Sequence, residues 1–256
     1  MKKILKPFEE LSSKTTSSIM TTWLFILVAF WVACSFGDTH LFPTPKQVGS
    51  GLVDLWKEGL VVHIVSSIAL CGKAVFISIL ISLFLAYSSA IPFFSPIGTF
   101  ISKLRYLPLT GIAFYLAIMI NDARVLQVWV LVVFMTTFLT TSLIQMIKDI
   151  QPEEFDHART LGCSRWEILW EVVIKGRLDY VFELVRQNLA IVWMMLVTVE
   201  SILVAAGGLG FLIKNNDKLG DSGKVIALQI IIVLLGLSLD FIITSLRKLI
   251  FTYSNF

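Results

Sequence analysis

The sequence predicts an all-helical, polytopic membrane protein with six transmembrane helices, and three observations support this fold class. Of the 256 residues, 56% are hydrophobic and 15% are charged, whereas a soluble domain carries about a quarter charged residues. The mean hydropathy is +0.83. Several apolar stretches approach the roughly 20 residues that a helix needs to cross a bilayer, and they lack the period-two alternation that marks a membrane barrel.

The six expected spans follow from these stretches in chain order. The third begins with Leu107-Pro108 and is short, so we expect it to be tilted, kinked or extended by the residues before it. The chain 1–256 is therefore predicted to form one transmembrane domain. The spans are expected at residues 21–36, 61–90, 106–120, 125–147, 188–206 and 225–249.

The first span could be misread as a signal peptide, because Lys residues precede its apolar run and 32–34 (VAC) resembles a lipoprotein cleavage site. The run starts about twenty residues into the chain and Trp31 fits poorly before such a site, which favours a retained span. The three cysteines, Cys34, Cys71 and Cys163, show no paired spacing. Neither a disulfide nor a metal site is expected.

The distribution of Lys and Arg predicts the orientation. Segment 1–20 carries four lysines, and positive charge favours the cytoplasmic side. With six alternating spans, both termini and the polar segment 148–182 are then cytoplasmic. The net charge of +3 reflects this topology and gives no reason to invoke nucleic acid. Of the 21 Lys and Arg residues, the outer side would carry only Lys46, Lys57, Arg124, Lys214, Lys218 and Lys224.

A strongly polar insert, residues 151–180, separates the fourth and fifth spans. Pro152 suits the first turn of a helix, where its missing N–H is not needed. The acidic residues that follow, beginning with Glu153, place negative charge at the positive end of the helix dipole. We expect this helix to end near Leu161, with Gly162 in a left-handed turn.

A second helix is predicted directly after that turn. Ser164 and Glu167 form an S-x-x-E capping box, and Trp166 and Trp170 lie on the amphipathic stretch that follows. Two interpretations remain open from these residues alone. The insert could rest on the membrane surface, or it could dock onto a partner in the cytoplasm.

Residues 156–164 (DHARTLGCS) resemble the E-A-A-R-T-L-G-A-S loop of bacterial ABC importer permeases, especially those for nitrate, sulfonate, taurine and bicarbonate-like solutes. Residues 41–48 (LFPTPKQV) are similar to the L-P-x-P-x-x-V segment after the first span of these permeases, and 63–67 (HIVSS) to the start of their second. Residues 200–203 (ESIL) with 207–213 (GGLGFLI) resemble their E-M-L…G-L-G-Y-L-I ending of the fifth span.

The resemblance implies that the insert is a coupling helix seated in a groove of a separate ATPase. Gly162 would turn the chain sharply beneath that partner, Ala158 would allow close approach, and Asp156 would offer a charged contact. The sequence departs from the family at Asp156-His157, which replace Glu-Ala, and at Lys175 and Asp179, which replace two prolines. We expect a changed entry angle into the fifth span. The implied coupling residues are Glu154, Asp156, Ala158, Arg159, Leu161, Gly162 and Ser164.

The resemblance also implies the surroundings of the chain. The expected partners are a dimer of ABC ATPase subunits, a second permease copy (in a homodimer or a heterodimer), an extracytoplasmic substrate-binding protein and the lipid of a bacterial cytoplasmic (inner) membrane. The sequence has no G-x-x-x-x-G-K-[ST] motif to hold nucleotide phosphates. We therefore expect no cofactor and no catalysis in this chain, with ATP and Mg bound by the partner ATPase.

Two charges lie inside the expected spans, where a charge costs about 2.5–3.5 kcal/mol on insertion scales. Lys73 could attract an anionic solute in the pathway, or it could snorkel or pair with a carboxylate. Glu200 could line the pathway or hydrogen-bond a neighbouring helix, and we favour a structural or gating role. Gly208 and Gly210 belong to a glycine-rich loop on the outer side, which we expect to be a tight turn at the outer gate.

The sequence thus predicts the permease subunit of an ABC importer, for a small anionic or polar solute. The alternative function is an ion-driven carrier or channel whose polar insert lies on the membrane surface. An intramembrane enzyme is a more distant third. The outer stretch 37–59 could meet a substrate-binding protein or cover the end of the bundle.

Overall fold

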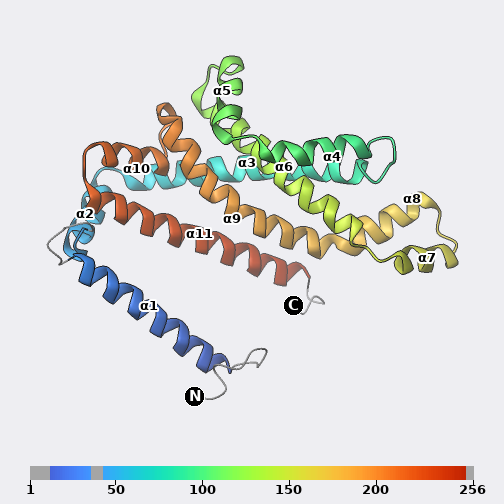
Figure 1. The fold of residues 1–256 in the computed structure, drawn as a ribbon, viewed down its shortest axis with the longest axis horizontal. Helices are drawn as coiled ribbons and strands as arrows, with labels where there is room; N and C mark the ends of the chain where they lie inside the picture. Colours follow the sequence, from blue (N-terminus) through green and yellow to red (C-terminus); the bar gives the residue numbers. More distant parts are fainter. Residues whose placement is uncertain (1–11, 36–42, 252–256) are drawn as a thin grey trace.

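The computed structural model describes residues 12–35 and 43–251, and within these ranges the chain folds into helices without a strand (Figure 1). Expectations for residues 1–11 and 36–42, including most of the N-terminal segment and Leu41-Phe42, lie outside the described residues. The long helices are α1 (Ser13–Ser35), α3 (Leu60–Ser88), α6 (Ala123–Lys148), α9 (Leu178–Ile202) and α11 (Ser222–Ile250). The shorter α-helices are α2 (Pro45–Lys57), α4 (Ser95–Lys103), α5 (Leu109–Met119), α7 (Pro152–Thr160), α8 (Arg165–Ile168) and α10 (Leu209–Lys218).

Five of the six expected spans are confirmed as long apolar helices. They are α1, α3, α6, α11 and the continuous run Arg165–Ile202 that contains α9. The fifth span was expected at 188–206, but α9 begins at Leu178 and ends at Ile202. The first turns of α9 are polar, so hydropathy placed the start of this span about ten residues too late.

The third expected span, 106–120, is wrong as a single crossing helix. It contains α5, which has 11 residues and therefore a length of about 16 Å, half the thickness of a hydrocarbon core. The break before it lies at Pro108, which has an extended ψ of 140° and precedes the first residue of α5. Proline has no N–H to continue a helix, so α4, a 3₁₀ turn and α5 replace the expected single helix.

Small side chains let α3 and α6 approach closely. Ala74, Ser78 and Ser82 of α3 are fully buried. The Ser78 hydroxyl donates to the Val132 carbonyl at 3.3 Å, and the Ser82 hydroxyl to the Thr136 carbonyl at 3.4 Å. Close packing and interhelical hydrogen bonds hold helices together in lipid, where burial of apolar surface drives association little.

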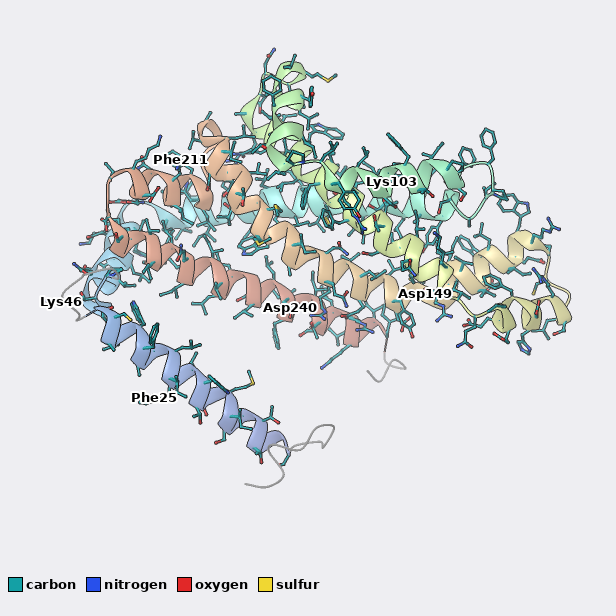
Figure 2. The ribbon with its side chains drawn as sticks, viewed as in Figure 1. Phe25, Lys46, Lys103, Asp149, Phe211 and Asp240 are labelled. Atoms are coloured by element: carbon teal, nitrogen blue, oxygen red, sulfur yellow. The ribbon has the colours of Figure 1, made fainter. Side chains whose placement is uncertain are left out.

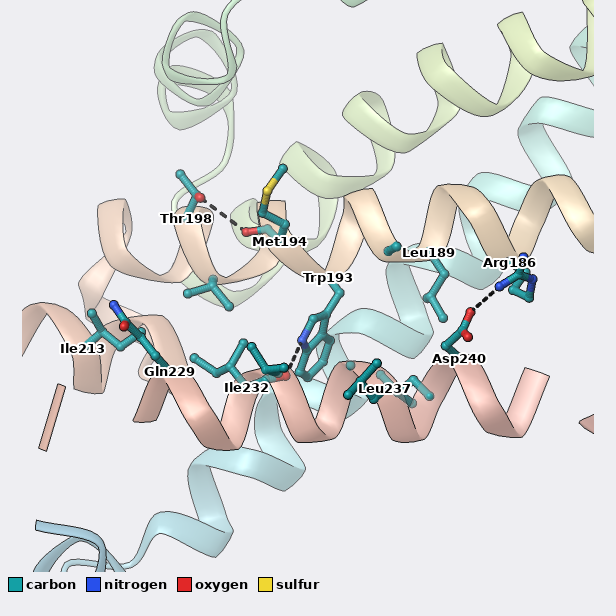
Figure 3. Close-up of a pocket in the computed structure, with 15 residues that line it drawn as sticks. Arg186, Leu189, Trp193, Met194, Thr198, Ile213, Gln229, Ile232, Leu237 and Asp240 are labelled. Carbon is teal, nitrogen blue, oxygen red and sulfur yellow. Dashed lines mark hydrogen bonds and ion pairs between the residues drawn. The ribbon is translucent and has the colours of Figure 1, made fainter. Parts of the chain in front are cut away.

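A groove between α9 and α11 is closed at its middle by Trp193 (Figure 3). The indole N–H donates to the Ile232 carbonyl at 3.0 Å. The ring lies over Gly236, where an added Cβ would come within 3.0 Å of it. Towards the end of the groove near the C-terminus of α11, Arg186 donates to Asp240 at 2.7 Å, and Arg247 donates to Glu183 at 2.7 Å. The two helices are therefore tied together by the indole contact and by two ion pairs.

The outer end of the bundle is covered by α2, which the sequence reading treated only as part of an outer loop. Thr44 and Gln47 form a capping box at its start, and Leu55 is buried. A Cβ on Gly51 would lie 3.0 Å from the Lys224 amide nitrogen of α11. Figure 1 places α2 and α10 at one end of the long axis and α7 and α8 at the other.

Large apolar side chains point outward along the bundle, as expected of a chain in lipid. Helix α1 diverges from the other helices (Figure 1), and Phe25 on it is 74% exposed and points away from the chain (Figure 2). Phe114 and Tyr115 of α5 are similarly exposed.

Candidate functional site

The end of the molecule opposite α2 and α10 carries a turn between α7 and α8, which we call the elbow (residues 152–168). The Gly162 N–H donates to the Arg159 carbonyl at 3.0 Å, and the Cys163 N–H to the Ala158 carbonyl at 3.2 Å. These two bonds form a Schellman motif, whose pivot needs a positive φ. Gly162 supplies it with φ 83°. The prediction that α7 ends at a glycine with left-handed backbone conformation is confirmed.

The predicted capping box opens α8. The Ser164 N–H donates to the Glu167 carboxylate at 2.7 Å, and the Glu167 N–H donates to the Ser164 hydroxyl at 3.4 Å. The hydrogen bond that the Glu167 carboxylate accepts from the Ser164 N–H favours the charged form, so the pKa of the Glu167 carboxyl is lowered. The entry into α8 is therefore fixed by two reciprocal bonds.

The second helix of the insert does not stop before the fifth span. After α8 the chain continues through a π-helix, Leu169–Ile174, and a 3₁₀ turn, Lys175–Arg177, directly into α9. An ion pair between Arg177 and Glu154 ties this run back to α7. The elbow is therefore joined to α9 by helical residues and by an ion pair, with no loop between them.

The elbow presents an exposed surface that differs in part from the expected coupling set. Leu161 is 72% exposed. Asp156 and Arg159 form an exposed ion pair at 2.8 Å. Ala158 was expected to approach a partner closely, but it is buried within this chain and its carbonyl serves the Schellman turn. Of the expected coupling residues, Ala158 alone is buried.

The outer end carries a second polar cluster, which we call the outer clasp (Ser67, Glu200, Gly208, Leu209 and Gly210). Glu200 is fully buried. Its carboxylate accepts from the Ser67 hydroxyl at 2.7 Å and from the Gly210 N–H at 2.9 Å. The Leu209 N–H donates to the Ser67 oxygen at 3.0 Å. The clasp therefore joins α3, α9 and the start of α10.

The glycines of this loop are required by space as well as by backbone conformation. Gly207 and Gly208 have φ of 74° and 116°. A Cβ on Gly208 would overlap the Glu200 carboxylate, and one on Gly210 would overlap the Val197 carbonyl. The expected tight turn is thus confirmed, and its amides surround a carboxylate of the same chain. Glu200 is thus buried and hydrogen-bonded to a neighbouring helix, as the structural reading of this residue expects.

Three further residues that the sequence reading did not assign to this site hold the same loop. The His63 Nδ1 accepts from the Gly208 N–H at 3.2 Å. Arg124 donates to the Ser66 hydroxyl at 2.6 Å and to the Ala206 carbonyl. The buried Gln127 donates to the Leu203 carbonyl at 2.9 Å. Arg124 and Gln127 share the first turns of α6, a spacing of three on a helix, which was the signal available in the sequence.

Lys73 lies apart from both clusters and is exposed on α3. The described residues contain no group of three metal-ligating side chains, and Cys34, Cys71 and Cys163 are free thiols. The structure thus brings the expected outer-loop glycines together with Glu200, and the elbow residues with one another, but it does not bring Lys73 together with Glu200.

Comparisons with known proteins agree with this architecture. Residues 60–251 match the family described as the binding-protein-dependent transport system inner membrane component. The chain is 25% identical over 258 residues to the taurine transport system permease protein TauC of Escherichia coli strain K12, covering 93% of this chain and 90% of that protein. A putative ABC transporter permease protein of Methanocaldococcus jannaschii is 35% identical over 94 residues, which are 37% of this chain and 35% of that protein.

Solved structures show the same fold. A chain of the MetNI methionine ABC transporter in inward-facing conformations has a TM-score of 0.62 and 16% identity, covering 74% of this chain and 94% of its own. A chain of an amino acid ABC transporter crystallised with histidines has a TM-score of 0.60 and 16% identity, covering 77% of this chain and 95% of its own.

Proposed function

This chain belongs to the family of binding-protein-dependent transport system inner membrane components, the permease subunits of ABC importers, and from this premise we propose what it carries and how it is driven. ATP hydrolysis belongs to a separate subunit of such importers. The alternative of an ion-driven carrier is thereby set aside. The family also implies two kinds of partner, an ATPase and a substrate-binding protein, and places the multi-pass chain in the inner membrane.

We propose that the solute is a small anionic or polar molecule, such as a sulfonate. The similarity to a taurine permease supports this class, because it extends over 93% of the chain. Lys73 is an exposed cation within the largely apolar helix α3, and its charge would attract an anionic solute.

The coupling mechanism that we propose rests on the rigid elbow. Glu154, Arg159, Leu161 and their neighbours would seat in the ATPase, while ATP and Mg remain bound within that partner. Gly162 and Ser164 would set the direction of the elbow. Continuity of the helix from Arg165 to Ile202 would carry ATPase closure to the outer clasp, at the far end of α9. This continuity is the observation that carries the proposal.

In this proposal two copies of the chain, as a homodimer, enclose one pathway, with the N- and C-termini in the cytoplasm. The turn Gly208–Gly210 would form the outer gate, and Glu200 would hold it shut until α9 moves. A binding protein would meet the outer end, where α2 and α10 lie (Figure 1).

Two leucines allow a matched test of the elbow. Leu161 and Leu219 are each the last residue before a positive-φ glycine at a helix end, and they are 72% and 73% exposed. They lie at opposite ends of the molecule. We expect Leu161→Asp to reduce ATPase co-purification about tenfold or more, because a charge would replace an apolar contact with the groove of the partner ATPase. Leu219→Asp should leave co-purification unchanged.

The measurement is ATPase subunit retained per permease after affinity purification, with ATP-dependent taurine uptake into proteoliposomes as the second readout. Equal retention by wild type and Leu161→Asp would show that the elbow is not the docking surface. Both variants change an exposed side chain, so neither should alter the folded amount of permease.

A further inference from the structure

Lys73 lies near the middle of α3, far from both ends of the helix. It is about 20 Å along α3 from each end of that helix, at 1.5 Å per residue. A hydrocarbon core is about 30 Å thick, so each interface is about 15 Å from its middle. If α3 is centred in the bilayer, each interface is farther from the Lys73 backbone than the four-carbon stem of lysine reaches.

The side of α3 that carries Lys73 is open. The opposite face packs on α6 through small residues such as Ala74 and Ser78. A Cβ built on the adjacent Gly72 would meet no atom within 4 Å, and Lys73 itself is exposed. The other exposed side chains of this stripe are apolar or small: Val62, Val65, Ala69, Phe76, Leu80 and Phe84.

Within the described spanning helices, no carboxylate forms an ion pair with Lys73, and each is bound elsewhere. In the described spanning helices, Glu200 is enclosed in the outer clasp, and Glu183 and Asp240 are held by Arg186 and Arg247. Asp179, at the start of α9, also has a partner. A second copy of the chain would hold its own carboxylates in the same way.

A lysine that faces lipid at this depth costs about 2.5–3.5 kcal/mol, and intramembrane charges consequently face aqueous cavities or pathways. We propose that Lys73 and its stripe on α3 line the water-filled solute pathway, and that the Lys73 ammonium binds the oxyanion group of a sulfonate- or carboxylate-class solute near the midplane. This inference rests on the proposed importer function and deepens it. A hydrated point charge on a flexible stem suits an anion that must bind and then leave.

Water access can be measured without knowing the solute. In a variant with Cys34→Ser, Cys71→Ala and Cys163→Ser, the whole complex with its ATPase and binding protein is reconstituted in vesicles. Lys73→Cys is compared with Leu234→Cys, which lies at similar depth on α11 and is 58% exposed. The probe is the anionic reagent 2-sulfonatoethyl methanethiosulfonate. Because the thiolate forms only in a polar site, we expect about tenfold faster modification of Lys73→Cys. An equal or slower rate would overturn the proposal.

A second measurement reads the charge of Lys73. Ala69→Cys, one helical turn before Lys73 on the same stripe, is modified with the anionic reagent and with a trimethylammonium analogue. We expect the ratio of anionic to cationic rates to fall about tenfold when Lys73→Gln is added and to recover with Lys73→Arg, since the local potential sets ion concentration. A ratio unchanged by Lys73→Gln would refute anion attraction.

The two proposals fail separately. Modification rates need neither ATP nor a known solute. An accessible Lys73→Cys, together with no ATP-driven taurine uptake by the complex that retains Lys73, would reject the proposed solute class and leave the pathway role intact. ATP-driven uptake with inaccessible Lys73→Cys would reject the pathway role of Lys73 alone.

Discussion

Glycine serves two different purposes in this chain. At Gly162 and Gly220 the backbone has a positive φ but an added Cβ would meet nothing within 4 Å. At Gly208 the same kind of φ coincides with contact against the Glu200 carboxylate. Replacement costs only backbone strain, on the order of 1 kcal/mol, in the first case, whereas in the second it must also displace a buried charge.

The neighbouring glycines of the outer clasp provide a test of this difference. Both Gly207 and Gly208 have positive φ, but the nearest atom to a Cβ on Gly207 is a His63 ring atom at 3.6 Å. We expect Gly208→Ala to lower the melting temperature of the purified permease by several degrees more than Gly207→Ala, because only the former dislodges Glu200.

Amide hydrogen exchange at Leu209 and Gly210 is the second measurement, since both N–H groups are bound within the clasp. Similar protection and similar melting in the two alanine variants would show that Glu200 does not hold this loop.

At the scale of elements, the unusual feature is the run from α8 into α9. Six residues, Leu169–Ile174, form a π-helix, a conformation that is rare and often found at functional positions. Lys175 and Asp179 stand where the family usually has prolines, and a helix without proline can continue unbroken. The expectation of a changed entry angle into α9 stays a prediction.

The Arg177–Glu154 ion pair connects the elbow to the start of α9. We expect the elbow and α9 to move together because of this contact, and its loss to uncouple them. Arg177→Ala should reduce ATP-driven taurine uptake several-fold while ATPase co-purification persists, because the docking surface remains. The exchange Arg177→Glu with Glu154→Arg should restore uptake in part. Lys175→Ala is the matched control, since Lys175 pairs with Glu171 within the same helical run.

Uptake that survives Arg177→Ala unchanged would show that the ion pair carries no displacement. Loss of uptake in Lys175→Ala as well would point instead to a general effect of positive charge at this surface.

At the scale of the whole molecule, the two ends differ in what they present. One end carries the elbow, with its acidic α7 and exposed Leu161, and the other carries α2 and α10 packed over the outer ends of the spans (Figure 1). Between them, large apolar side chains face outward.

This arrangement predicts which introduced cysteines a membrane-impermeant maleimide can reach in whole cells. The permease in this experiment lacks its three native cysteines. Lys46→Cys, on α2, should be labelled in intact cells. Arg165→Cys, at the start of α8, should be labelled only after the membrane is permeabilised, because the excess of Lys and Arg at that end favours the cytoplasm. The reverse pattern would invert the proposed orientation.

The sequence by itself determined the helical membrane class, five of the spans and the form of the elbow. These features are local: hydropathy acts over about 20 consecutive residues, and the Gly162 stop and the Ser164–Glu167 box act within four residues. For the same reason the break at Pro108 was visible as a kink, although the short length of α5 was not.

Only the tertiary structure decided the fate of the polar residues inside the spans. Glu200 meets Ser67 across two helices far apart in the chain, Arg124 reaches the Ala206 carbonyl, and Ala158 turns inward, all of which depend on how helices rotate against one another. One sequence gives the periodicity of a helix but not the neighbour that each face meets. Lys73 was left with three readings for this reason, and the structure adds that Glu200, Glu183 and Asp240 inside the spans each have another partner.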